Sequence, residues 1–285
     1  MIKVNKNNWN IKIKNILKKK KSQIKNFIKS YKSLQIRKFS LDGALNNKLT
    51  ENIRIAHLTD QHIGKITPFS VQLNAIEETN KQNIDLVLLS GDFVCHDNLF
   101  LNDLIYLIKQ FKAPVFAVLG NHDHWTNAQS VKKALEKAGA EVLNNANTSI
   151  KIKHQKIQLI GIDDSCTGNH NIKKAILGMN KKLPSIGLSH IGEEADILWK
   201  NNIPLVLSGH THAGQIAIAG INKILVEKIA GYKYIHGFYN KKGSNPENAS
   251  VYISAGIGSA LIPIRIGKKS KREVTIFNLK KPKTS

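Results

Sequence analysis

The sequence is poor in cysteine, in acidic residues and in long apolar runs, and each shortage excludes a class of protein. Its 285 residues include only two cysteines, Cys95 and Cys166, too few for a disulfide framework and without a CxxC pair. No run of about 18 apolar residues is present to form a transmembrane helix. Lysines interrupt the N-terminus too often for a secretory signal. We therefore expect a cytoplasmic protein.

The shortage of acids is confined to the two ends of the chain. The whole chain has 43 Lys and Arg against 20 Asp and Glu, a formal net charge of +23. Residues 1–40 hold 13 of these basic residues and no acid, and residues 268–285 hold 7 with a single acid, Glu273. Residues 41–267 carry a net charge of only +4. The basic character therefore belongs to the termini.

Residues 1–45 are predicted to form a basic amphipathic N-terminal segment. Apolar residues recur at helical spacings, as at Trp9, Ile13 and Ile16, and most lysines lie off this stripe. Such a helix binds an anionic membrane surface, each basic residue contributing about 1 kcal/mol, which predicts a peripheral protein on the inner face of the cell membrane. A solvated, partly disordered tail fits the same composition. Nucleic-acid contact is disfavoured because arginine and aromatic residues are scarce.

Residues 46–285 are predicted to form one α/β domain. Short apolar runs alternate with helical patterns, which is typical of buried strands flanked by helices. The predicted helices cover residues 70–82, 100–111, 128–138 and 193–201. The predicted strands cover residues 53–59, 84–90, 114–119, 157–162, 185–189, 204–208, 251–254 and 273–279.

Acidic, histidine and asparagine residues follow immediately after five of these strands. The clusters are Thr59-Asp60-Gln61-His62, Ser90-Gly91-Asp92, Gly120-Asn121-His122-Asp123, Ser189-His190 and Ser208-Gly209-His210-Thr211-His212. The carboxyl ends of strands in an open α/β sheet converge on the ligand crevice, so these side chains are expected to meet. An extended backbone would put both side chains of Asp60-x-His62, and of His210-x-His212, on one side. Imidazole, carboxylate and amide ligands suit borderline or hard divalent cations.

As a set, these clusters resemble the calcineurin-like metallophosphoesterases, whose pattern is D-x-H, GD, GNH(D), a lone H and GH-x-H. All five blocks occur in order over roughly residues 50–280. The resemblance implies an α/β fold, a β-sandwich of two mixed sheets flanked by helices (four-layer αββα), that binds two divalent metal ions, with Mn, Fe, Zn and Mg as candidates. It implies one ion held by Asp60, His62 and His212, a second held by Asn121, His190 and His210, and Asp92 bridging both.

The resemblance also implies roles beside the metals. His122 matches the family's non-ligand histidine beside the scissile phosphate, where it stabilises charge or protonates the leaving oxygen. Asp123 is expected to orient His122. In such a site two cations activate a shared water for in-line attack on phosphorus. Arg265 is a candidate phosphate-binding residue through its bidentate fork, with a surface or capping role equally compatible.

The C-terminal half is similar to one branch of this family. Gly209 to Ile216, Gly256-Ile257-Gly258 and Pro263-Ile264-Arg265 resemble the branch that includes membrane-proximal bacterial phosphodiesterases and one type of UDP-2,3-diacylglucosamine pyrophosphatase. The resemblance implies a metal-dependent hydrolase of a phosphodiester or pyrophosphate bond. Its most concrete substrate is a lipid-linked nucleotide, UDP-2,3-diacylglucosamine, cleaved to lipid X and UMP in lipid A biosynthesis.

Two other functions are compatible with the same blocks. One is a phosphodiesterase or nuclease acting on nucleotides or nucleic acid, against which stands the nearly neutral charge of residues 41–267. The other is a scaffold that has lost its metals and binds protein partners. Such a scaffold should have replaced ligand positions, and here all seven are intact.

Overall fold

The computed structural model describes residues 34–43, 45, 47–95, 97–214, 231–240, 249–260, 265 and 270–282. Most of the predicted basic N-terminal segment, residues 1–33, lies outside this part of the chain, so its predicted helix is not tested. Among the described residues, no helix has both the length and the apolar character needed to cross a membrane.

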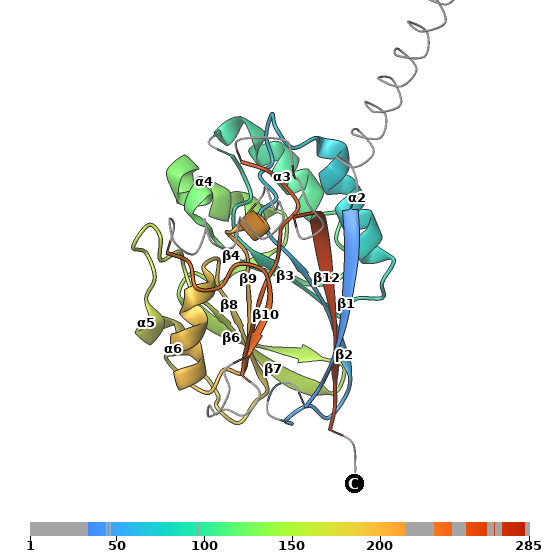
Figure 1. Ribbon diagram of the computed structural model, residues 1–285, viewed down its shortest axis with the longest axis vertical. Helices are drawn as coiled ribbons and strands as arrows, with labels where there is room; N and C mark the ends of the chain where they lie inside the picture. The colour runs from blue at the N-terminus through green and yellow to red at the C-terminus, as the bar shows by residue number, and fades with distance from the viewer. Residues whose placement is uncertain are drawn as a thin grey trace, which may run out of the picture. The chain divides into compact units, whose positions relative to one another are not determined.

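Two six-stranded mixed sheets form the centre of the fold (Figure 1). The first has the order β1-β12-β2-β3-β4-β5. Its strands are β1 (Leu34–Asp42), β2 (Ile53–Leu58), β3 (Leu86–Ser90), β4 (Val115–Val118), β5 (Glu141–Val142) and β12 (Arg272–Lys280). Strands β2 to β5 run parallel to one another, and β12 runs antiparallel to β2.

The second sheet has the order β10-β11-β9-β8-β7-β6. Its strands are β6 (Ala146–Ile152), β7 (Gln155–Gly161), β8 (Ser185–Leu188), β9 (Leu205–Ser208), β10 (Gly237–Asn240) and β11 (Ser250–Ile253). The four central strands are parallel, and the edge strands β6 and β10 are antiparallel to their neighbours. The carboxyl ends of the central strands therefore lie at one edge of this sheet.

Alternating side chains separate the inner and outer faces of the sheets. Ile55 and Leu88 belong to the core between the sheets, whereas their neighbours Ala56 and Val87 belong to a core under helices. The first sheet is covered by α2 (Phe69–Asn80), α3 (Leu101–Ile108) and α4 (Asn121–Lys137). The second is covered by α5 (Ile172–Ala175) and α6 (Ala195–Lys200). These layers confirm the predicted αββα sandwich.

All eight predicted strands and all four predicted helices are present, with shifted ends. The described residues also form short 3-10 helices at Asn98–Phe100, Gly192–Glu194 and His212–Gly214. The helix predicted at 128–138 is the second part of α4. Non-helical backbone at Asn127 separates it from a first part that begins at Asn121, where the side chain of Asp123 accepts a hydrogen bond from the Gly120 N–H. Strands β5, β6 and β10 and helix α5 were not predicted.

Strand β1 changes the predicted domain boundary. Leu34–Asp42 pairs in parallel with β12 along its whole length, so these residues belong to the first sheet. The predicted boundary at residue 45 therefore falls after the first strand. Arg37 and Lys38 extend the basic pattern of the N-terminal segment into this strand, which hides its alternation of buried and exposed residues.

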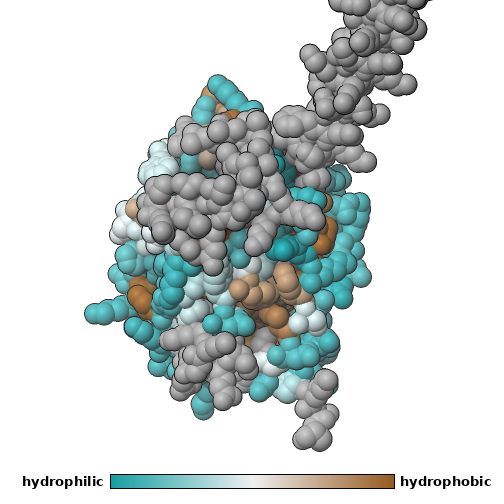
Figure 2. Space-filling view, in the orientation of Figure 1, coloured by the Kyte–Doolittle hydropathy of each residue, from teal (hydrophilic) through white to brown (hydrophobic). Residues whose placement is uncertain are grey.

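The face of the sandwich seen in Figure 2 is mainly hydrophilic, and apolar side chains gather on it between β10 and β12. Phe238 of β10 and Phe39 of β1 pack against the core between the sheets. Their rings meet edge to face with centroids 4.9 Å apart, a favourable aromatic arrangement. Aromatic packing thus covers the core at the side of the sandwich where the edge strands β1 and β10 lie.

Candidate metal centre

The structure brings all seven predicted ligands together where strands of both sheets end. Strands β2, β3 and β4 of the first sheet are followed by Asp60 and His62, by Asp92 and by Asn121. Strands β8 and β9 of the second sheet are followed by His190, and by His210 and His212. Two hydrogen bonds join the sheets here. His190 Nδ1 donates to the Ser90 carbonyl at 2.7 Å, and the His210 N–H donates to the Asp60 carboxylate at 3.1 Å.

Four buried side chains form the first ligand group: Asp60, His62, Asp92 and His212. Their ligand atoms converge on one point. His62 Nε2 lies 3.0 Å from His212 Nε2 and 3.5 Å from Asp92 Oδ2. His212 Nε2 lies 3.3 Å from Asp60 Oδ1. Two imidazoles and two carboxylates therefore face one small volume.

Asp92, His190 and His210 form the second ligand group. Asn121 completes it, because its Oδ1 lies 3.1 Å from His190 Nε2 and 3.0 Å from His210 Nδ1. Asp92 Oδ2 lies 3.3 Å from His190 Nε2 as well as 3.5 Å from His62 Nε2. The carboxylate of Asp92 thus stands between the two groups, at the position predicted for a bridging ligand.

The spacing and chemistry of these atoms fit divalent cations. Ligands about 2.0–2.1 Å from a metal lie roughly 2.9 Å apart in octahedral and 3.4 Å apart in tetrahedral arrangements. Neighbouring ligand atoms here lie 3.0 to 3.5 Å apart, and His62 Nε2 lies 4.0 Å from Asp60 Oδ1. His190 also shows the hydrogen bonding of a metal-binding histidine, since Nδ1 donates to a backbone carbonyl and leaves the Nε2 lone pair for a metal.

Burial and nearby charges set the protonation of these groups. Burial lowers the pKa of His62 well below its ordinary value and that of His210 to about 4, so both imidazoles are neutral and offer a lone pair. Burial also disfavours a charged His190, but the adjacent Asp92 carboxylate raises its pKa to about 10. His190 and Asp92 form a buried ion pair, and a cation held there would take the place of the His190 proton.

The backbone is left-handed at most of the ligands. The φ angles are 52° at Asp60, 44° at His62, 58° at Asp92, 71° at His210 and 49° at His212. The D-x-H and H-x-H pairs therefore lack the extended backbone that would place both side chains on one side, and their side chains converge because the chain turns at each of these residues. A non-glycine residue in this region costs about 1–2 kcal/mol, and such strain clusters at functional sites.

Two glycines let the loop after β3, residues 91–94, make close contact with the start of α4. We call this loop the Asp92 loop. Gly91 has a φ of 87°, and a Cβ there would lie 2.6 Å from the Gly120 nitrogen. Gly120 has an ordinary φ of −115°, but a Cβ there would collide with Asp92 Oδ1. Gly91 is therefore required for a turn, whereas Gly120 is required for a close approach.

His122 lies at the rim of the first ligand group. Its backbone N–H donates to Asp92 Oδ1 at 2.9 Å. Its ring stands nearly perpendicular to the His62 ring, with centroids 4.7 Å apart, and lies 4.9 Å from the Trp125 ring. Because the side chain is only partly buried, it is placed to meet a substrate.

The contacts of Asp123 correct its predicted task of orienting His122. Its buried carboxylate accepts hydrogen bonds from four backbone N–H groups. Oδ2 accepts from Asp92 and Gly120, both at 2.9 Å, and Oδ1 accepts from Phe93 at 2.8 Å and Val94 at 3.3 Å. Asp123 therefore fixes the Asp92 loop against α4. Burial and the Asp92 charge raise the pKa of Asp123 to about 7.

The guanidinium of Arg265 contacts the protein itself, as in the capping role that the sequence left open. Its guanidinium donates to the carbonyls of Ala255, Gly256, Gly258 and Ser270. It also donates to His212 Nδ1 at 3.0 Å, so Nε2 of that ring is the nitrogen turned toward Asp60 and the first ligand group. The fork expected to bind phosphate is thus occupied by the protein itself, and Arg265 orients His212.

Tyr232 is a site residue that the sequence did not reveal. Its hydroxyl lies 2.6 Å from His210 Nε2. Since His210 Nδ1 faces the second ligand group, Nε2 carries the proton and donates to Tyr232, as in the outer contacts of metal-binding histidines. No spacing rule connects a tyrosine at this position with the GH-x-H block.

An αββα sandwich with aspartate and histidine ligands at its strand ends defines a metal-dependent phosphoesterase. The family model for calcineurin-like phosphoesterases matches residues 53–214, more than half of the chain. The chain therefore belongs to the calcineurin-like phosphoesterase family, and it is a hydrolase of phosphoesters that uses divalent metal.

Three bacterial relatives show the extent of the similarity. Phosphodiesterase YaeI of Escherichia coli is 29% identical over 234 residues, which cover 79% of this chain and 82% of YaeI. Metallophosphoesterase YkuE of Bacillus subtilis is 27% identical over 236 residues, 81% of this chain and 80% of YkuE. A metallophosphoesterase of Helicobacter pylori is 29% identical over 234 residues, 77% of this chain but only 58% of that longer relative.

Proposed function

We propose that this chain hydrolyses a phosphodiester or pyrophosphate bond with the help of two divalent cations. The observation that carries the proposal is the place of Asp92, whose Oδ2 lies 3.5 Å from His62 Nε2 and 3.3 Å from His190 Nε2. One carboxylate between two ligand groups serves both cations. When bound, two cations polarise the phosphoryl oxygens and lower the pKa of water.

The ligand atom types in the two groups are compatible with several metals. Imidazole, carboxylate and amide oxygen are shared by sites for Mn, Fe, Zn and Mg, so the donor set supports any of these four. Asp123 and the glycines at 91 and 120 hold Asp92 in place. Tyr232 and Arg265 hold the rings of His210 and His212. The chain itself thus positions the ligands that the cations need.

His122 is the proposed general acid. Its backbone hydrogen bond to Asp92 anchors residue 122 beside the ligands, and its partly buried ring lies at the rim next to His62. As the bond between phosphorus and the leaving oxygen breaks, the imidazolium proton passes to that oxygen. A hydroxyl nucleophile is not needed, because two cations would activate water. The hydroxyls of Ser189 and Ser208 lie 3.0 Å apart and bond to each other.

Trp125 is the proposed contact for an organic group of the substrate. Its side chain is 56% exposed, and its ring lies 4.9 Å from that of His122. An exposed indole beside the reacting position offers an apolar face on which a base or acyl chain can pack. The name of the E. coli relative favours a diester. UDP-2,3-diacylglucosamine, which has a base and acyl chains, is the most specific candidate.

The test compares three substrates with Mn²⁺ added: bis(p-nitrophenyl) phosphate, p-nitrophenyl phosphate, and UDP-2,3-diacylglucosamine in detergent micelles. We expect cleavage of the diester by the wild type and a loss of about 100-fold or more in Asp92→Asn. Asp103→Asn, an acid-to-amide change on α3, is the matched control and should keep full activity. UMP release would identify the lipid-linked nucleotide as a substrate. Metal-loaded protein inert on all three compounds would refute the proposal.

We also propose that the protein works on the inner face of the cell membrane. The support is the sequence of residues 1–40, with 13 basic residues, no acid and an amphipathic pattern. The full chain should sediment with vesicles rich in phosphatidylglycerol and be released by high salt. Equal binding to neutral phosphatidylcholine vesicles would contradict an electrostatic attachment.

A further inference from the structure

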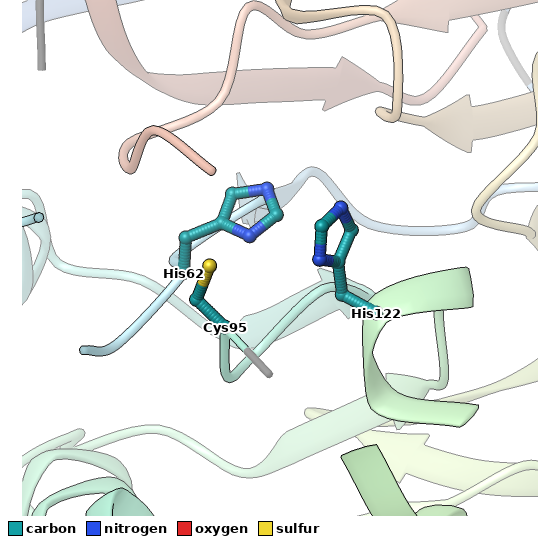
Figure 3. A group of neighbouring side chains, drawn as sticks. All are labelled: His62, Cys95 and His122. Atoms are coloured by element: carbon teal, nitrogen blue, oxygen red, sulfur yellow. The ribbon is translucent and has the colours of Figure 1, made fainter. Parts of the chain in front are cut away.

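A third group of metal-ligating side chains lies beside the first ligand group. It consists of His62, Cys95 and His122, whose ligand atoms lie within 4.8 Å of one another. Figure 3 shows the thiol of Cys95 and the two imidazole rings turned toward one another. The sulfur is the feature that distinguishes this group, because neither of the two ligand groups described above contains cysteine.

His62 has a ring nitrogen that the first ligand group does not use. Nε2 faces His212 and Asp92, whereas Nδ1 is buried with no hydrogen-bond partner among the described residues. A buried polar group without a partner costs about 1–3 kcal/mol. Metal-binding histidines normally direct the second nitrogen to a carboxylate, carbonyl or water. In His62 this nitrogen faces the space between Cys95 and His122 (Figure 3).

Cys95 is held in place by its own hydrogen bonds. Its backbone N–H donates to the Ile63 carbonyl at 3.2 Å, and its thiol donates to the Ala260 carbonyl at 3.2 Å. Because the thiol donates to this carbonyl, it is protonated in the absence of a cation. The side chain is only half-buried, which leaves an approach from solvent.

We propose that Cys95 Sγ, His62 Nδ1 and His122 bind a soft divalent cation such as Zn²⁺, and that this cation inhibits hydrolysis by immobilising His122. Nitrogen and thiolate donors select zinc over manganese or magnesium. Sulfur and nitrogen ligands of a tetrahedral zinc lie about 3.5 Å apart, so the three side chains must close by about 1 Å. The Cys95 thiol gives up its hydrogen bond to the Ala260 carbonyl as its S–H bond breaks, which frees the sulfur to move. The fourth position is left to water.

Binding releases two protons. The S–H bond of Cys95 and the N–H bond of His62 Nδ1 break as the bonds to zinc form, and both protons pass to solvent. His62 then contacts this cation through Nδ1 and the first ligand group through Nε2. The inhibitory effect rests on the proposed catalytic role of His122, whereas the binding of the cation does not.

Binding is tested with Co²⁺, because a thiolate bound to cobalt gives a charge-transfer band in the near ultraviolet. The full chain is titrated as wild type, Cys95→Ser and Cys166→Ser. Serine keeps the size of cysteine and a donor for the Ala260 carbonyl, and Cys166 is the only other cysteine in the chain. We expect the band in the wild type and in Cys166→Ser, and no band in Cys95→Ser. A band that persists without Cys95, or is absent from the wild type, overturns the site.

Inhibition is tested by adding Zn²⁺ to the Mn²⁺-loaded protein with bis(p-nitrophenyl) phosphate as substrate. Each variant is compared with its own rate before zinc is added. We expect Cys95→Ser to need at least about tenfold more zinc for half inhibition, while Cys166→Ser behaves as the wild type. An unchanged zinc dependence in Cys95→Ser overturns the inhibitory role. Failure of the proposed function looks different, since no variant would then hydrolyse the diester and the cobalt band would be unaffected.

Discussion

Replacing Asp123 by asparagine removes the negative charge and one of the two oxygens that accept hydrogen bonds, without changing the size of the side chain. Each carboxylate oxygen accepts two backbone N–H groups, those of Asp92 and Gly120 at Oδ2 and those of Phe93 and Val94 at Oδ1. Whichever way the amide is placed, its NH₂ faces two buried donors. Each donor left without an acceptor costs about 1–3 kcal/mol, so we expect the free energy of unfolding to fall by roughly 2–6 kcal/mol.

The assay is denaturant unfolding of the two Mn²⁺-loaded forms about one pH unit above the carboxyl pKa of about 7. Bound cations offset the Asp92 charge that, together with burial, favours a neutral Asp123 and would otherwise reduce the difference between the two forms. Glu136→Gln is the matched control, because it makes the same change near the far end of α4 on a half-exposed side chain. The free energy of unfolding of Glu136→Gln should stay within about 0.5 kcal/mol of the wild-type value. If Asp123→Asn also stayed within that range, Asp123 would not be holding the Asp92 loop, and the reasoning would be refuted.

Three further changes test other parts of the account. Gly120→Ala should lower kcat by about 100-fold because its Cβ collides with Asp92 Oδ1, and a wild-type rate would contradict that contact. Tyr232→Phe should weaken cation binding by about 10- to 100-fold in calorimetric titration, since His210 Nε2 loses its partner; equal affinity would exclude that role. Burial raises the pKa of Glu273, but its contacts with His236 and Arg37 outweigh burial and lower it. The ionised Glu273 therefore stabilises the folded state above pH 4.5, and this stabilisation is lost in acid. The unfolding free energies of wild type and Glu273→Gln should therefore converge below pH 4.5, and a difference independent of pH would count against this.

The strands and their terminal motifs were predictable because both are local patterns. The apolar run of β2 ends directly before Asp60, and that of β9 directly before Gly209 and His210, so strand position and ligand position follow from the same residues. Parallel pairing of β2 with β3, and of β8 with β9, then places these ends together. The division of the seven residues into two ligand groups came from the family resemblance and not from the strand pattern.

Contacts between distant segments explain what the sequence did not show. Asp123 bonds to a loop thirty residues earlier, and Arg265 bonds to His212 across 53 residues, so neither role is visible in a local motif. The left-handed turns at Asp60 and His210 depend on the packing of the two sheets, because such backbone is unfavourable for an isolated residue. Strand β1 was missed since its partner, β12, lies at the opposite end of the chain.

The number of cations bound per chain, measured by elemental analysis after loading with Mn²⁺, tests the central claim most directly. Asp92 is the only predicted ligand shared by both ligand groups. We predict two cations in the wild type, and no more than one in Asp92→Asn, with hydrolysis of bis(p-nitrophenyl) phosphate lost in parallel. An Asp92→Asn protein that keeps two cations and full activity would contradict the account.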